Sequence, residues 1–139
     1  MSAPIISGPR RTRSAVAGLL CLVTLVGASA VSAPAEAKGG DVVRRGDCAR
    51  TTDWKLKVGP EDGRLEVEAQ VDSNRARQTW RWRLVHNGSV SASGLRVTRP
   101  PSGSFTVRRV MVNLPGRDVV TVRAVNIRSG EVCRGTVRF

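Results

Sequence analysis

The chain has 139 residues, a formal net charge of +12 and 40% hydrophobic residues, which fits one small folded domain rather than a disordered chain. It contains three cysteines and a single histidine, His86. A catalytic triad or a histidine-rich metal site would depend on that one imidazole, so we expect no enzyme, no metal and no cofactor. Because Asn87 and Gly88 follow, we expect His86 to be a polar residue at the end of a hairpin.

Residues 1–37 have the composition of a secretory signal peptide. Three arginines and no acidic residue occur in the first 13 positions, and an apolar run follows over residues 15–26. Small residues then offer cleavage sites after Ala30, Ala33 or Ala37, among which the sequence does not decide. The apolar run is too short to cross a bilayer. We therefore predict cleavage, no remaining membrane span and a secreted, extracellular protein, with association to the cell wall left open.

The cysteines predict one disulfide bond. Cys21 lies within the apolar run and would be removed with the signal peptide, which leaves Cys48 and Cys133. An even number of cysteines in a short exported chain is typical of a structural disulfide. A Cys48–Cys133 bond would connect the start of the mature domain to the last predicted strand.

We expect a flexible linker over residues 38–47 and a β-domain over residues 48–139. Within this domain apolar and polar residues alternate with the period of a half-buried strand, as in Leu65, Val67 and Ala69. Turn residues separate the alternating segments, and no helical periodicity is present. Seven strands are predicted, over residues 53–58, 64–72, 79–85, 89–98, 105–112, 118–126 and 133–139. Seven short strands indicate an all-β, antiparallel, immunoglobulin-like sandwich.

Several local features refine this prediction. Asn87-Gly88 is typical of a type I′ hairpin turn. We expect bulges at Gly94 and at Arg108-Arg109, where the alternation changes phase. Trp80 and Trp82 alternate with arginines, so we expect both indoles to lie in the core.

Four segments of the chain resemble those of a known group of proteins. In chain order they are TTDWKLKVGPEDGRLEVEAQVDSNR, QTWRWRLVHNG, GSFTVRRV and RSGEVCRG. They resemble small secreted proteins of actinobacteria that have an immunoglobulin-like sandwich and no characterised function. The resemblance covers residues 48–139. It implies the fold and export, and it transfers no site residue.

Positive charge is concentrated in the second half of the chain. Residues 38–72 have a formal net charge of −1, whereas residues 73–139 hold thirteen arginines against Asp118 and Glu131, for a net charge of +11. If the third, sixth and seventh predicted strands share a sheet, five of these arginines lie on one outer face. This candidate anion-binding face consists of Arg81, Arg83, Arg123, Arg134 and Arg138.

These features predict a non-catalytic secreted binding or structural domain, with an anionic cell-envelope polymer as the partner of the arginine face. Two alternatives remain open. The arginines could form a solvated face with no dedicated ligand, or the protein could be a secreted protease inhibitor that presents residues 99–103 or 113–117. We do not expect a nucleic acid partner, because the chain is predicted to be exported and the outer face of the arginines has no aromatic residues as stacking platforms. The sequence leaves the oligomeric state open.

Overall fold

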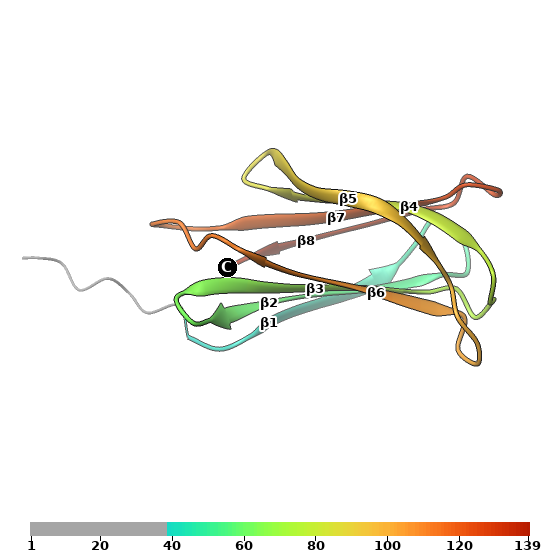
Figure 1. Ribbon diagram of the computed structural model, residues 1–139, viewed down its shortest axis with the longest axis horizontal. Helices are drawn as coiled ribbons and strands as arrows, with labels where there is room; N and C mark the ends of the chain where they lie inside the picture. Colours follow the sequence, from blue (N-terminus) through green and yellow to red (C-terminus); the bar gives the residue numbers. More distant parts are fainter. Residues whose placement is uncertain (1–38) are drawn as a thin grey trace, which may run out of the picture. The chain divides into compact units, whose positions relative to one another are not determined.

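Two four-stranded antiparallel sheets pack face to face in this protein (Figure 1). The computed structural model describes residues 39–139, so the signal peptide predicted for residues 1–37 lies outside the described residues. All eight regular elements in the described part are strands. Within the same part, no helix is long and apolar enough to cross a membrane.

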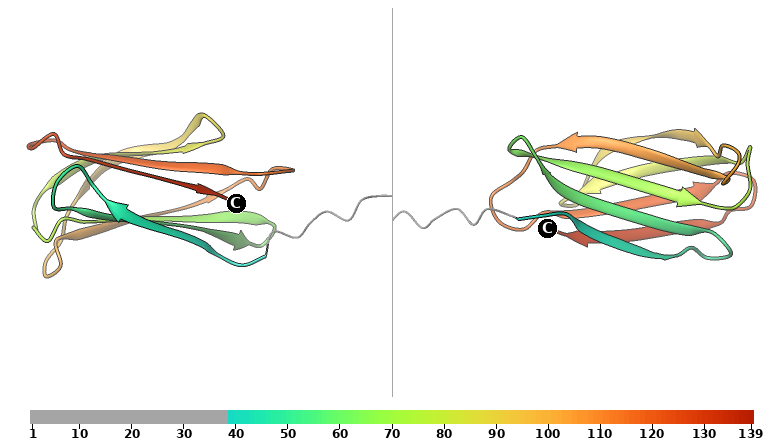
Figure 2. Two further views of the ribbon diagram at one scale, coloured as in Figure 1. Left: turned by 180° about the vertical axis from the view of Figure 1, so that it is seen from behind. Right: turned by 90° about the horizontal axis from the view of Figure 1, so that it is seen from below.

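The two layers are seen from behind and from below in Figure 2. The first sheet has the order β1-β2-β3-β6, with β1 Val42–Asp47, β2 Asp53–Glu61, β3 Arg64–Asp72 and β6 Ser104–Met111. The second sheet has the order β5-β4-β7-β8, with β4 Thr79–His86, β5 Ser89–Val97, β7 Val119–Asn126 and β8 Val132–Arg138. The expected antiparallel sandwich is therefore present.

The prediction of seven strands and of a linker over residues 38–47 was wrong, because part of that linker forms β1. This strand pairs with β2 in continuous register, with Arg44 opposite Leu56 and Gly46 opposite Trp54. Its inward positions hold Val42, Arg44 and Gly46, so they lack the apolar alternation that marks the other strands. Backbone pairing along the edge of a sheet does not require that alternation.

The hairpin turns follow the expected chemistry. Asn87 and Gly88 both have positive φ angles, 48° and 86°, as a type I′ turn requires, so this prediction is confirmed. Asp62 and Gly63 repeat the same conformation, with φ angles of 45° and 75°, between β2 and β3.

The bulge predicted at Gly94 was misplaced, and the bulge predicted at Arg108-Arg109 was wrong. The irregularity in β5 lies opposite Leu84 and Val85, and Gly94 instead pairs in register with Trp82. A Cβ on Gly94 would lie 3.3 Å from the Trp82 ring, so the glycine makes room for the indole. In β6 the register with β3 is continuous, and Arg109 occupies an inward-facing position opposite Val67. An arginine at an inward position interrupts the alternation of apolar and polar residues, so the sequence looks as if a bulge were present.

The core lies between the sheets and is built from the alternating apolar positions of both. Trp80 and Trp82 are 0% and 1% exposed, which confirms the prediction that they are core residues. Trp80 contacts Phe105 of the opposite sheet, with ring centroids 6.3 Å apart. Aromatic side chains of this size supply a large part of the buried apolar area in a domain of about 100 residues.

On the side of the sandwich where β8 faces β1 and β2, a disulfide bond and the indole of Trp54 close the gap between the sheets. Cys48, just after β1, forms the predicted disulfide with Cys133 in β8. The Trp54 ring packs on Gly46 of β1 and on Gly135 of β8. Its Nε1 donates a hydrogen bond to the Asp47 carbonyl at 3.2 Å. Both glycines provide space that any other side chain would fill.

The opposite side, between β5 and β6, is closed by two arginines at inward-facing positions. The guanidinium of Arg96 lies 5.8 Å from the centroid of the Trp82 ring, and that of Arg109 lies 5.3 Å from it. Each side chain donates to the carbonyl of the preceding residue, Arg96 to Leu95 at 3.0 Å and Arg109 to Arg108 at 2.7 Å. The apolar stems cover the core while the charged ends reach the solvent.

Reduction of the disulfide should destabilise the domain strongly. The bond separates residues that are 85 positions apart, and a loop of that length corresponds to on the order of 4–5 kcal/mol in the chain-entropy model. Urea unfolding of the protein with and without reductant measures this difference. The Cys48→Ala/Cys133→Ala variant should match the reduced protein and should not respond to reductant. Equal unfolding midpoints for oxidised and reduced wild type would contradict the prediction.

The Gly135→Ala variant should unfold more easily, because the added Cβ would overlap with the Trp54 ring. Overpacking of this kind costs about 1–3 kcal/mol. In a Trp54→Ala background the same change should be neutral or stabilising, since alanine suits a strand better than glycine. A cost of Gly135→Ala that is the same in both backgrounds would show that the ring is not its cause.

Candidate anion-binding face

All five predicted arginines lie on the outer face of the second sheet. Arg81 and Arg83 come from β4, where they alternate with the buried residues Trp80, Trp82 and Leu84. Because side chains alternate between the two faces of a strand, burial of these three forces the arginines outward. Arg123 from β7 and Arg134 and Arg138 from β8 are placed on the same face by the strand register.

Three of these arginines form a row across the sheet. Arg83 pairs in register with Arg123, and Arg123 pairs in register with Arg134. Neighbouring strands are about 4.8 Å apart, so three guanidinium groups project from adjacent positions. Like charges that lie directly opposite one another destabilise a sheet. The row therefore carries a local cost that a mixed-charge face would avoid.

Among residues 39–139, no carboxylate on this face compensates the row. Asp118 and Glu131, the acidic residues of the second half, are both buried. Asp118 accepts hydrogen bonds from His86 at 2.6 Å and Asn87 at 3.1 Å, and Glu131 accepts one from the Thr52 amide at 3.2 Å. Within residues 39–139, no salt bridge joins any of the five arginines to an acidic side chain.

The face is hollowed beside β5. A depression of about 460 Å³ is lined by Arg81, Arg83 and Arg123 together with Ser93 and Leu95 of β5. Ser93 lies opposite Arg83 and is short, so the arginines stand above their neighbour on this edge strand. The depression gives a ligand access to three guanidinium groups from one side.

On the outer face of the first sheet, in contrast, Lys55 and Arg108 are paired with carboxylates. Glu68 binds both Lys55 at 3.0 Å and Arg108 at 2.6 Å, and Glu66 binds Arg108 at 3.2 Å. Hydrogen bonds from Arg108 and Lys55 lower the pKa of Glu68 below its usual range. The same contact with Glu68 raises the pKa of Arg108. Beside this network, the hydrogen bond and charge of Asp41 raise the pKa of Lys57.

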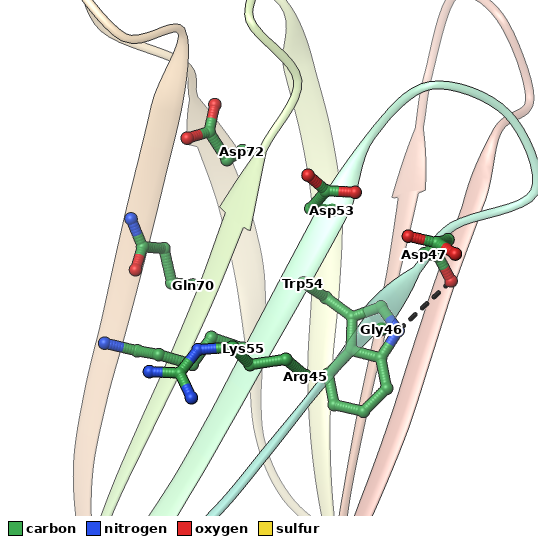
Figure 3. A pocket seen from close by; sticks show the side chains of 8 residues that line it. All are labelled: Arg45, Gly46, Asp47, Asp53, Trp54, Lys55, Gln70 and Asp72. Atoms are coloured by element: carbon green, nitrogen blue, oxygen red, sulfur yellow. Dashed lines mark hydrogen bonds between the residues drawn. The ribbon is translucent and has the colours of Figure 1, made fainter.

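Sequence reasoning missed a pocket of about 560 Å³ on the first sheet. Asp47, Asp53 and Asp72 lie in register across β1, β2 and β3. Figure 3 shows these carboxylates toward one end of the pocket and the nitrogen ends of Arg45 and Lys55 toward the other. This row of aspartates depends on the pairing of β1 with β2, which the sequence pattern did not predict. In the described part of the chain, no group of three acidic, histidine or cysteine residues is close enough to hold a metal ion.

His86 lies at the end of its hairpin as expected, but it is buried, at 8% exposure, rather than a solvated polar residue. Its Nε2 lies 2.6 Å from Oδ1 of Asp118, which is fully buried. Asn87 holds the same carboxylate and also accepts a hydrogen bond from the Val119 amide at 2.8 Å. The pair therefore anchors the hairpin to the start of β7. Local sequence patterns do not indicate this pairing, because 32 residues separate the partners.

The predicted site residues thus fall into two groups. Cys48 and Cys133 form the disulfide that connects the two sheets. The five arginines share one face of the second sheet. Comparison of the chain with family models, with curated proteins and with solved structures gives no match.

The Glu68→Gln variant should lose a contribution to stability that depends on pH. Because the pKa of Glu68 is lower in the folded chain than in the unfolded chain, this contribution is complete above the unfolded value and is lost as the pH falls through the folded value. Wild type should exceed the variant by about 0.5–1 kcal/mol near neutral pH, as is usual for a solvent-accessible pair.

The difference between wild type and Glu68→Gln should shrink as the pH falls below about 4.5. Urea unfolding of both proteins across a pH series measures it. Glu61→Gln is the matched control, since Glu61 is exposed and forms no salt bridge with the other described residues. A difference that persists unchanged in acid would contradict the role of the carboxylate.

Proposed function

We propose that the protein is a non-catalytic secreted binding domain that holds an anionic cell-envelope polymer on the outer face of its second sheet. The observation that carries the proposal is the row formed by Arg83, Arg123 and Arg134, with no carboxylate of the described residues on the same face. A charge arrangement that disfavours the folded state alone becomes favourable when an external anion neutralises it.

The chemistry of guanidinium suits this role. Each arginine presents a planar fork that binds phosphate or carboxylate oxygens with two hydrogen bonds. A flexible polyanion that crosses β4, β7 and β8 would meet a new fork about every 4.8 Å. Exposed contacts of this kind are individually weak, and repetition along the polymer adds them. The binding would be reversible and strongly dependent on salt.

Secretion and the immunoglobulin-like class are parts of the same proposal. The predicted signal peptide and the Cys48–Cys133 disulfide support an oxidising, extracellular location. Central strand β4, with its core residues Trp80 and Trp82, supports an immunoglobulin-like sandwich. The disulfide connects the segment before β2 with the last strand, which differs from the antibody pattern, where the bridge joins the second and sixth strands.

The Arg83→Gln/Arg123→Gln/Arg134→Gln variant should bind isolated cell envelope about ten-fold or more weakly at low salt, because three contacts of about 0.5–1 kcal/mol each are lost. Co-sedimentation of the secreted protein with envelope across a salt series measures the affinity. The variant should unfold at the same or a higher temperature than wild type, since repulsion within the row is removed. Loss of binding would then not reflect loss of folding.

The control variant, Arg45→Gln/Arg50→Gln/Arg64→Gln, removes three exposed arginines outside the second sheet and changes the net charge equally. It should retain most of the binding. Equal losses of binding in the two triple variants would show that net charge, and not the arginine face, causes the binding. If wild type does not bind envelope even at low salt, the proposal fails, and a screen against secreted proteases would test the inhibitor alternative.

A further inference from the structure

A second depression, of about 730 Å³, lies where the chain crosses from β5 to β6, and we name it the crossover groove. Arg96 and Arg99 line it together with the hydroxyl-bearing residues Ser102 and Ser104. Leu95 and Val97 add apolar surface. Among the described residues, no acidic side chain lines the groove. Its volume is in the range of sites for small organic ligands.

The wall of the groove is fixed by hydrogen bonds. The Arg99 amide donates to the Ser104 carbonyl at 2.9 Å, and the Gly103 amide donates to the Arg99 carbonyl at 2.8 Å. The Ser73 hydroxyl holds the Gly103 carbonyl at 2.9 Å. Gly103 has a φ of 73°, and a Cβ there would overlap with the backbone of Arg75. The crossover is thus locked onto a neighbouring loop, and a ligand would meet a preformed surface.

The guanidinium group of Arg96 in the groove is also held in place. Arg96 stacks on Trp82 and donates one N–H to the Leu95 carbonyl, so most of its five N–H groups remain for another acceptor. Arg109 approaches the same indole from the first sheet, which adds a second positive charge nearby. Within the described residues, no salt bridge neutralises Arg96, Arg99 or Arg109. An oxyanion would be attracted by all three.

The apolar part of the groove points to more than an inorganic ion. Leu95 and Val97 are 54% and 48% exposed, although leucine and valine gain by removal from water. Phe105, which is buried, adds an aromatic surface to the lining. A ligand that combines an anionic head with an apolar chain would satisfy the arginines and cover Leu95 and Val97 together.

We propose that the crossover groove binds a small amphiphilic oxyanion, a phosphate or carboxylate group with a short apolar chain attached. The head would lie on Arg96 and Arg99, and the chain would cover Leu95 and Val97. This site is separate from the arginine row, and its ligand is recognised by a single head group rather than by repeated charge. The two sites adjoin, because Leu95 lines both the groove and the depression on the second sheet.

The probes are hexyl phosphate, hexanoate, inorganic phosphate and hexanol, titrated into the secreted protein. Because Arg96 stacks on Trp82, tryptophan fluorescence should report occupation of the head site, and calorimetry should give the affinity. Hexyl phosphate should bind about ten-fold or more tightly than inorganic phosphate, since six carbon atoms leave water. Hexanol should not bind measurably. Comparison with hexanoate shows whether phosphate or carboxylate is the preferred head.

The Arg96→Gln/Arg99→Gln variant should lose about ten-fold or more of the affinity for hexyl phosphate, because both charge-assisted contacts are removed. Leu95→Ser/Val97→Ser should bring hexyl phosphate down to the affinity of inorganic phosphate. The control Arg117→Gln/Arg128→Gln removes the same charge from exposed positions outside both depressions and should bind as wild type does.

Nuclear magnetic resonance of the wild type tests the location without a variant, so a variant that fails to fold leaves the test intact. Hexyl phosphate should shift the amide signals of Val97, Arg99 and Gly103. Shifts confined to residues outside the groove, equal affinities for hexyl phosphate and inorganic phosphate, or equal losses in the groove and control variants would each overturn the proposal. So would the absence of saturable binding.

Discussion

A two-sheet sandwich exposes its core along two open sides, and each side must be covered by a side chain that reaches across. On one side this chain uses Trp54, seated on glycines of β1 and β8, together with the Cys48–Cys133 disulfide. On the other side Arg96 and Arg109 extend over Trp82 from the two sheets. The glycines, the inward arginines and the cysteines all answer this one requirement. A small core of this size leaves little stability to lose at either side.

The arginines at inward positions also protect the edges of the sheets. Arg44, Arg96 and Arg109 all occupy inward positions on edge strands, and each donates to the carbonyl of the residue before it. An edge carbonyl that is already bonded is a poorer acceptor for a strand from another molecule, and an inward charge opposes such pairing. The arginines thus close the core and shield the edge at once. A leucine at these positions would cover the core equally well but would leave the edge open.

These arginines also explain where reasoning from the sequence succeeds and where it stops. Alternation of apolar residues located the strands from β2 to β8 and placed the five outer arginines, because burial of one face determines the other. The alternation fails where an inward position holds a polar residue that passes over the core. Arg44 concealed β1, and Arg109 imitated a bulge. The aspartate row and the pairing of His86 with Asp118 depend on contacts between distant segments, which periodicity does not encode.

The distribution of acidic residues separates the proposed binding face from a bias in composition. A preference for arginine over lysine accounts for the number of arginines, but it does not remove acidic side chains from one sheet. Of the carboxylates on the first sheet, Glu66 and Glu68 are placed to neutralise Arg108 and Lys55. On the second sheet Arg123 is flanked by two arginines, and no carboxylate in the described part of the chain neutralises it. Like charges in adjacent register destabilise a sheet, so an anion from outside the chain that neutralised this row would stabilise the folded domain.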